Sequence, residues 1–244
     1  MPTFHFTHKK DQYTYRSEEG VSLGHPLANN GITPKAWYSP NPDLKAIQGE
    51  GFLGDRRLGG NVNSEEITLQ PHSHGTHTEC YGHLSKKRVT LRDVFTGYMG
   101  LATLCTIDLP YGEPIEEEHL PNSSMPALLI RTNKRGFEGK DFSNTNPSFL
   151  SPKAMQKIVD MKVDHLMIDL PSVDPERDGG ALEAHKIFWD IHEEESRRPS
   201  CTITEMIRIP QSVSDGIYFM NLQTLDWRTD AVPSNPIIYP VRKG

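Results

Sequence analysis

A short segment between Pro71 and His83 concentrates side chains that bind metal ions. It holds four of the protein's 11 histidines and one carboxylate, Glu79. Imidazole and carboxylate groups are the usual ligands of the divalent ions in hydrolytic enzymes. The candidate ligands of this segment are His72, His74, His77 and Glu79. A polar loop whose histidines only form hydrogen bonds would contain the same residue types, but the density of the cluster favours a metal site.

The spacing within the segment predicts which of these side chains point together. Residues 66–70 alternate like a half-buried strand, and side chains two residues apart on a strand share a face. If the extended backbone continues past Pro71, His77 and Glu79 point the same way. The two histidines that come first in the segment would then point away from His77. They could join the site only if the backbone turns at Pro71.

The segment resembles the signature of the cyclase family, which holds the bacterial kynurenine formamidases and isatin hydrolases. That signature reads His-x-Gly-Thr-His-x-Asp-x-Pro-x-His. The residues in register with it are Gly75, Thr76, His77 and His83. Glu79 replaces the family aspartate, which keeps a carboxylate but lengthens it by one methylene. Ser73 stands where the family has its first histidine, and Tyr81 stands where it has proline.

Two further stretches resemble this family. Residues 165–175 resemble its apolar strand and the following Asp-x-x-Ser-x-Asp loop. His185 then opens a helical segment, as the family's distal metal-binding histidine does. Glu205 lies in a segment that resembles the one with the family's last carboxylate ligand, after an apparent insertion at residues 193–199. The resemblance runs from about Val21 to the C-terminus.

The resemblance implies a β-rich mixed α/β fold, the swivelling β/β/α domain of the family. It implies one or two divalent ions per chain, Zn or Mn, and a homo-oligomer, either a dimer or a tetramer. The implied ligands are His77, Glu79, His185 and Glu205, with His72 and His74 as further candidates. A bound ion lowers the pKa of its water from about 15.7 toward ~7. His83 matches the family's acid/base histidine, and an imidazole pKa of about 6.5 suits proton transfer to a leaving amine.

We therefore expect a metal-dependent hydrolase of C–N bonds other than peptide bonds, acting on an amide, a cyclic amide or an arylformamide. Two alternatives remain open. One is a cupin-type oxidoreductase, whose first motif is met by His72, His74 and Glu79, although Glu66 and Lys86 stand where that motif has glycine. The other is a catalytically inactive metal-binding scaffold. No Gly-x-Gly-x-x-Gly fingerprint of a nicotinamide or flavin site follows a strand.

Composition fits one compact domain over residues 1–244. The formal net charge of -6 argues against a nucleic-acid surface, which needs a basic patch. Three cysteines are too few and too scattered for a disulfide framework. The first residues lack the apolar run of a signal peptide, and no run of 18 apolar residues occurs. We expect a cytoplasmic protein with a small-molecule substrate and without a membrane partner.

Several elements must position the candidate ligands. The apolar runs that predict buried strands are 101–109, 127–131 and 163–170. Ser151 followed by proline predicts a helix start, Thr90 predicts the cap of a short helix, and a further helix is expected near residues 181–193.

Two regions lie outside these elements. Alternating aromatic residues predict an added hairpin within residues 1–20. Residues 26–60 are rich in Gly, Pro and Asn, which predicts irregular structure, and long loops often bind ligands. Trp37, Tyr38 and Phe52 lie there. They could form the wall of an aromatic substrate pocket, and packing in a core would explain them as well.

Overall fold

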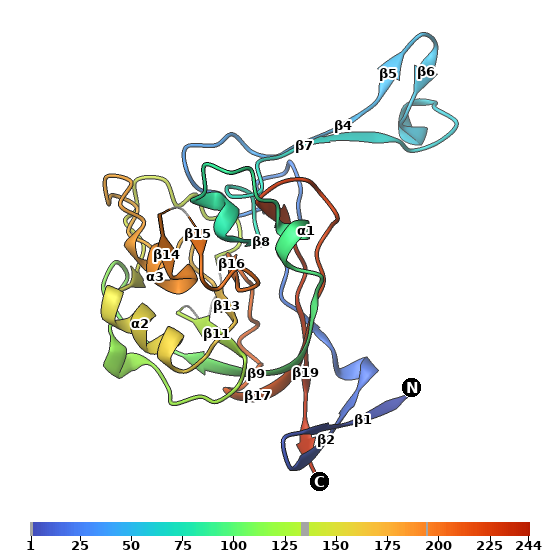
Figure 1. Cartoon of the computed structure of the whole chain (residues 1–244). Coiled ribbons are helices and arrows are strands. Elements are labelled where there is room, and N and C mark those ends of the chain that lie inside the picture. The colour runs from blue at the N-terminus through green and yellow to red at the C-terminus, as the bar shows by residue number, and fades with distance from the viewer. Residues whose placement is uncertain (1, 133–136, 194) are drawn as a thin grey trace.

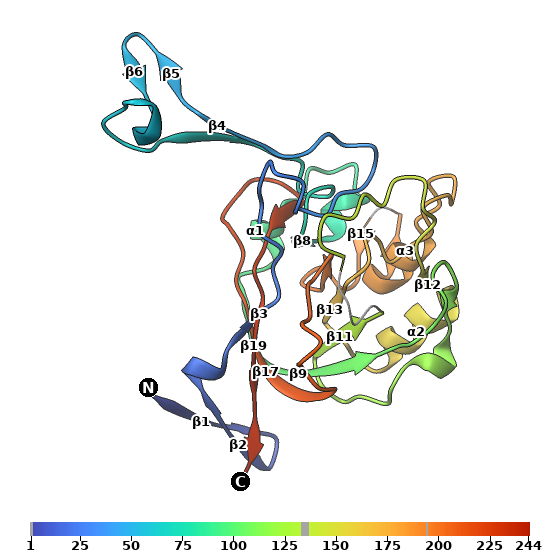
Figure 2. The same cartoon turned by 180° about the vertical axis from the view of Figure 1, so that it is seen from behind.

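The computed structural model describes residues 2–132, 137–193 and 195–244, and one strongly curved sheet dominates it (Figures 1 and 2). Among the described residues, nine strands form this sheet in the order β18-β8-β16-β13-β11-β9-β17-β19-β3. In this order the strands are β18 (Ala231–Pro233), β8 (His77–Glu79), β16 (Thr202–Glu205), β13 (His165–Ile168), β11 (Ala127–Arg131), β9 (Tyr98–Thr106), β17 (Gly216–Leu222), β19 (Ile237–Pro240) and β3 (Val21–Ser22). Neighbours among β16, β13, β11 and β9 run parallel, and the other pairs are antiparallel. The expected β-rich mixed α/β fold is confirmed.

The central strands β11 and β13 are buried along their whole length. Their continuous apolar runs suit parallel strands that are covered on both faces. On one face Ile130 packs in a core with Met155 and Phe188. On the other face Leu129 packs in a second core with Met220. The two cores thus cover the sheet whose strand ends carry the loops of the site.

Two helices, α2 (Pro152–Asp160) and α3 (Glu183–Trp189), lie over one face of the sheet (Figure 1). The predicted start of α2 is confirmed. The Ser151 hydroxyl accepts a hydrogen bond of 3.2 Å from the backbone N–H of Ala154, which would otherwise be unpaired in the first turn. The helix expected near residues 181–193 is α3, and it carries His185.

The hairpin expected within residues 1–20 is present. It consists of β1 (Thr3–His8) and β2 (Asp11–Arg16), and β20 (Arg242–Lys243) pairs with β2. The Tyr15 ring stacks on the Phe219 ring of β17, with centroids 4.4 Å apart. This contact attaches the hairpin to the main sheet.

A two-stranded arm, residues 43–68, projects from the body (Figures 1 and 2). Its strands are β4 (Asp43–Ala46), β7 (Glu65–Thr68), β5 (Gln48–Gly49) and β6 (Phe52–Leu53). The irregular structure expected over residues 26–60 is therefore wrong for the part that forms the arm. These strands are short and largely exposed. The strand predicted over residues 66–70 is present in part as β7, but all four residues of β7 are exposed rather than half-buried.

The remaining elements are short. They are α1 (Leu91–Val94), β10 (Pro114–Ile115), β12 (Phe149–Leu150), β14 (Ile191–His192), β15 (Glu195–Ser196), η1 (Ser17–Glu19), η2 (Arg56–Leu58), η3 (Tyr81–His83) and η4 (Glu117–His119). Thr90 caps α1 as predicted, in a capping box with Asp93. Within the described ranges, none of the helices has the length and apolar character needed to cross a bilayer.

Candidate metal centre

Strand β8 places two of the expected ligands side by side. It lies between β16 and β18, and all three of its residues are buried. In its antiparallel register with β16, His77 lies opposite Glu205. His77 Nε2 is 3.4 Å from Glu205 Oε2. The spacing of two residues puts Glu79 on the same face as His77, as the sequence predicted.

The backbone turns just before β8, and this turn determines where the side chains of His72 and His74 point. The backbone N–H groups of Ser73 and His74 both donate to the carbonyl of Gln70, at 3.0 Å each. Gly75 follows with φ of 65°, a value that favours glycine. Because the extended backbone is interrupted, the alternation from β7 does not carry through. His72 therefore reaches the cluster, with Nδ1 at 3.2 Å from Glu79 Oε2.

His74 corrects the set of ligands expected from the sequence. Its Nδ1 accepts a hydrogen bond of 2.9 Å from the backbone N–H of Gln70, and its Nε2 donates to the carbonyl of Pro40 at 2.8 Å. Both ring nitrogens are thus engaged with backbone groups away from Glu79. His74 holds the turn in place and is not available as a ligand.

His185 reaches the cluster from α3, where Asp174 orients it. The Asp174 carboxylate accepts hydrogen bonds from the backbone N–H groups of Ala184 and His185, at 2.7 and 3.1 Å, and it pairs with His185 Nδ1. The other ring nitrogen, Nε2, lies 3.0 Å from Glu79 Oε1 and 3.6 Å from Glu205 Oε1. A carboxylate on one imidazole nitrogen commonly fixes the direction of the other toward a metal.

The charges of the cluster are strongly coupled. Burial opposes the ionised form of Glu79, but His83, His185 and His72 together hold the pKa of that carboxyl well below its usual value. Burial likewise opposes the charged form of His185, yet Glu79, Asp174 and Glu205 raise the pKa of its imidazole well above the usual value. The ionised form of Glu79 and the protonated form of His185 therefore stabilise each other.

Two buried polar atoms of the cluster have ion-pair contacts but no well-formed hydrogen bond. Among the described residues, His77 Nε2 and Glu79 Oε2 are buried side-chain atoms without a hydrogen bond of acceptable geometry. Buried polar atoms are nearly always hydrogen-bonded, so two such atoms at one place need an explanation. Ligand atoms of His72, His77 and Glu79 lie within 4.8 Å of one another, as do those of Glu79, His83 and His185. Nitrogen and carboxylate donors at these separations fit a divalent cation.

A cavity of about 270 Å³ opens onto the cluster. Its lining residues are Trp37, His72, His83, Ser172, Pro175, Glu176, Asp178, Leu182, His185 and Glu205. Of the three aromatic residues expected at a substrate pocket, Trp37 lines this cavity. Tyr38 does not, because its side chain is turned outward, is 66% exposed and donates its hydroxyl to Asn144. Phe52 does not either, because it lies on the projecting arm.

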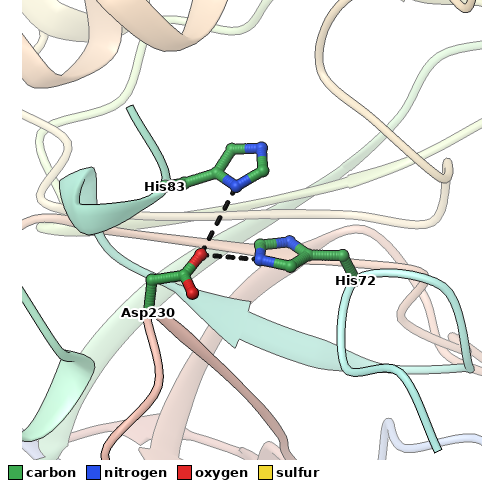
Figure 3. A group of neighbouring side chains, drawn as sticks. All are labelled: His72, His83 and Asp230. Atoms are coloured by element: carbon green, nitrogen blue, oxygen red, sulfur yellow. Dashed lines mark hydrogen bonds and ion pairs between the residues drawn. The ribbon is translucent and has the colours of Figure 1, made fainter. Parts of the chain in front are cut away.

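Asp230 is a member of the cluster that sequence reasoning missed. Its Oδ2 lies 2.7 Å from His72 Nε2 and 3.4 Å from His83 Nδ1 (Figure 3). Although burial opposes charge on the His72 imidazole, its hydrogen bond with Asp230 and its ion-pair contact with Glu79 raise the pKa of His72 to about 10. No local pattern marks Asp230, since only the pairing of β18 with β8 brings it here.

Comparison with models of protein families gave a match. The family model described as "Putative cyclase" matches residues 21–175. A comparison with curated proteins gave no match.

Several solved structures share the fold. One is a potential metal-dependent hydrolase with cyclase activity, at 20% identity and TM-score 0.65 over 91% of this chain and 98% of that chain. Another is a predicted metal-dependent hydrolase from Bacillus stearothermophilus, at 20% identity and TM-score 0.64 over 90% and 97%. An isatin hydrolase bound to the product analogue thioisatinate matches at 13% identity and TM-score 0.63 over 93% and 94%. With the family model covering more than half of its residues, the chain belongs to the cyclase family.

Proposed function

We propose that this protein is a metal-dependent hydrolase that uses an activated water to cleave the C–N bond of an amide, a cyclic amide or an arylformamide. The observation that carries the proposal is a pair of buried ligand atoms, His77 Nε2 and Glu79 Oε2, that have no hydrogen bond of acceptable geometry and lie beside a small cavity. When bound, a divalent ion would supply a nucleophile from water at neutral pH and would polarise a substrate carbonyl.

The residues that would hold the ion are His77, Glu79, His185 and Glu205, with His72 as a further donor. Glu205 is itself oriented, because its Oε1 accepts a hydrogen bond of 3.0 Å from the backbone N–H of Val173. The set contains only nitrogen and oxygen donors, which suits zinc or manganese. Elemental analysis distinguishes one bound ion per chain from two.

His83 is placed to move a proton. It lies at the end of η3 in the wall of the cavity, and its side chain is 30% exposed. Its Nδ1 faces Asp230, and Figure 3 shows the other ring nitrogen directed away from that carboxylate. An imidazole in this position can take a proton from water and deliver it to the leaving amine.

The cavity has the size and the wall to hold a small planar substrate. Its volume of about 270 Å³ suits a molecule of one or two rings, and the Trp37 indole forms part of its wall. The related isatin hydrolase was solved with thioisatinate, an analogue of its product. We therefore favour a cyclic amide fused to an aromatic ring, with an arylformamide second. The cupin alternative loses support because His74, one of its ligands, is engaged with backbone.

We also infer that the protein is a homo-oligomer in which the arm packs against a second copy. Five large apolar side chains on the arm are exposed: Ile47, Phe52, Leu58, Val62 and Ile67. An isolated two-stranded ribbon is marginally stable in water, so a surface that covers it would stabilise it. This agrees with the homo-oligomer implied by the family resemblance.

The metal ligands can be tested by elemental analysis of protein purified without added metal. We expect about one to two divalent ions per chain in the wild type. The double variant His77→Ala/His185→Ala should lose the ion, since each lost ligand weakens binding by on the order of 10-fold or more. His5→Ala, at an exposed histidine, is the matched control. Undiminished metal in the double variant would show that the ion binds elsewhere.

The role of His83 can be separated from metal binding. We expect His83→Ala to keep its metal and to lose on the order of 100-fold or more in turnover, because it removes proton transfer and leaves the ligands intact. Loss of metal together with activity would make His83 a ligand. Unchanged turnover would contradict the acid/base role.

The reaction class can be tested without oxygen. Zinc- or manganese-loaded protein should hydrolyse isatin or N-formylkynurenine under anaerobic conditions, because a metal-activated water needs no oxidant. Product is measured by absorbance and mass spectrometry, and His77→Ala/His185→Ala protein is the control. Stoichiometric oxygen consumption during turnover would indicate oxidoreductase chemistry instead. Absence of turnover in every metal form would favour the inactive scaffold.

The arm can be tested by light scattering after size-exclusion chromatography. We expect the wild type to be a dimer or tetramer, and Phe52→Asp/Val62→Asp to shift it toward monomer, because the charges oppose burial of the arm. Asn61→Asp, which places an acidic group on an exposed polar residue of the arm, should leave the mass unchanged. A monomeric wild type would contradict the inference.

A further inference from the structure

We propose that Asp230 is the positioning residue of this site, whose carboxylate fixes His83 in one tautomer and one direction. The inference rests on the proposed function, in which His83 transfers the proton. The Asp230 carboxylate also contacts His72, so that one carboxylate orders two imidazoles of the cavity wall.

The backbone of Asp230 is held against the strand that carries the ligands. Asp230 immediately precedes β18, in which Ala231 pairs with Glu79 of β8. The Asp230 carbonyl accepts a hydrogen bond of 3.0 Å from the backbone N–H of Cys80. The carboxylate therefore starts from a fixed point beside β8.

The side chain reaches two imidazoles with a single oxygen. Figure 3 shows His72 and His83 both directed at Asp230 Oδ2, at 2.7 and 3.4 Å. The two rings lie close together, with centroids 4.2 Å apart and planes inclined by 31°. All three side chains are between 28% and 34% exposed, so they stand at the boundary between the buried cluster and the cavity. One carboxylate oxygen therefore contacts both rings at this boundary.

The chemistry of the contact determines the tautomer. An ionised carboxylate can only accept hydrogen bonds, so the imidazole nitrogens that face it carry the protons. In a neutral His83 imidazole, a proton on Nδ1 makes the favourable contact with Asp230, and Nε2 is then able to accept a proton. A carboxylate that holds a histidine in its productive tautomer plays this part in other hydrolases.

The same three residues could instead hold a metal ion, since their ligand atoms lie within 4.8 Å of one another. Two observations favour positioning. His72 Nε2 and Asp230 Oδ2 are already joined by a direct hydrogen bond of 2.7 Å. The buried atoms of the cluster without a well-formed hydrogen bond belong to His77 and Glu79, and not to Asp230.

The test compares Asp230→Asn with Asp226→Asn, a matched change at an exposed aspartate four residues earlier. The first readout is the tautomer of His83, from two-bond nitrogen–proton NMR of the full-length protein with ¹⁵N-labelled histidine, assigned with His83→Ala. We expect Nδ1–H in the wild type and in Asp226→Asn, and a shift toward Nε2–H in Asp230→Asn, whose amide can donate. Metal content should be equal in all three proteins.

The second readout is turnover. Asp230→Asn should lower kcat on the order of 10-fold or more with little change in KM. In the His83→Ala background it should cause no further loss, because a residue that acts through His83 has nothing left to orient.

Three results would overturn the proposal: a His83 tautomer that Asp230→Asn leaves unchanged, a fall of metal content in that variant, or a further loss of turnover beside His83→Ala. The NMR result separates the positioning role of Asp230 from the proposed hydrolase function. If the tautomer shifts but the wild type hydrolyses nothing, the proposed hydrolase function fails and Asp230 still positions His83.

Discussion

The structure depends on keeping one carboxylate ionised where water hardly reaches it. The Glu79 side chain is 1% exposed. Removing an unpaired carboxylate from water is strongly unfavourable, so buried carboxylates persist only with compensating partners. Here the partners are imidazoles, and they come from three different parts of the chain: the turn before β8, η3 and α3. The fold must bring these parts together at the end of one short strand.

The sheet achieves this by combining two strand directions. The parallel strands β13 and β16 run side by side, so the segments that follow them leave the sheet at the same edge. Glu205 ends β16, and the loop after β13 leads to Asp174 and then to α3. The antiparallel strand β8 supplies His77 and Glu79 beside them. Two cores hold the strands, the hairpin lies at the far end of the molecule, and the arm projects outward from the body near β8.

The chain departs from the family signature in a connected way. Ser73 stands where the signature has histidine, and the turn before β8 brings the neighbouring His72 to Glu79. Glu79 is one methylene longer than aspartate and contacts both His72 and His185 with its two oxygens. Asp230 then forms a hydrogen bond with His72, the imidazole that the turn brings into the cluster. These departures from the signature are therefore compatible with one another. Together they still supply imidazole and carboxylate donors to the cluster.

The sequence by itself determined the elements whose signals are local. The apolar run at residues 127–131 is a buried strand, and the Ser151 cap starts α2, because these features depend on neighbours within a few residues. The alternation of His77 and Glu79 is local for the same reason. Only the tertiary structure decided that His72 faces the cluster and His74 does not, since a backbone turn of a few residues reverses the alternation. It also decided that Trp37 lines the cavity, that Phe52 lies on the arm, and that Asp230 joins two histidines more than 140 residues earlier in the chain. Those outcomes depend on strand pairing between distant segments, which no local pattern of residue types specifies.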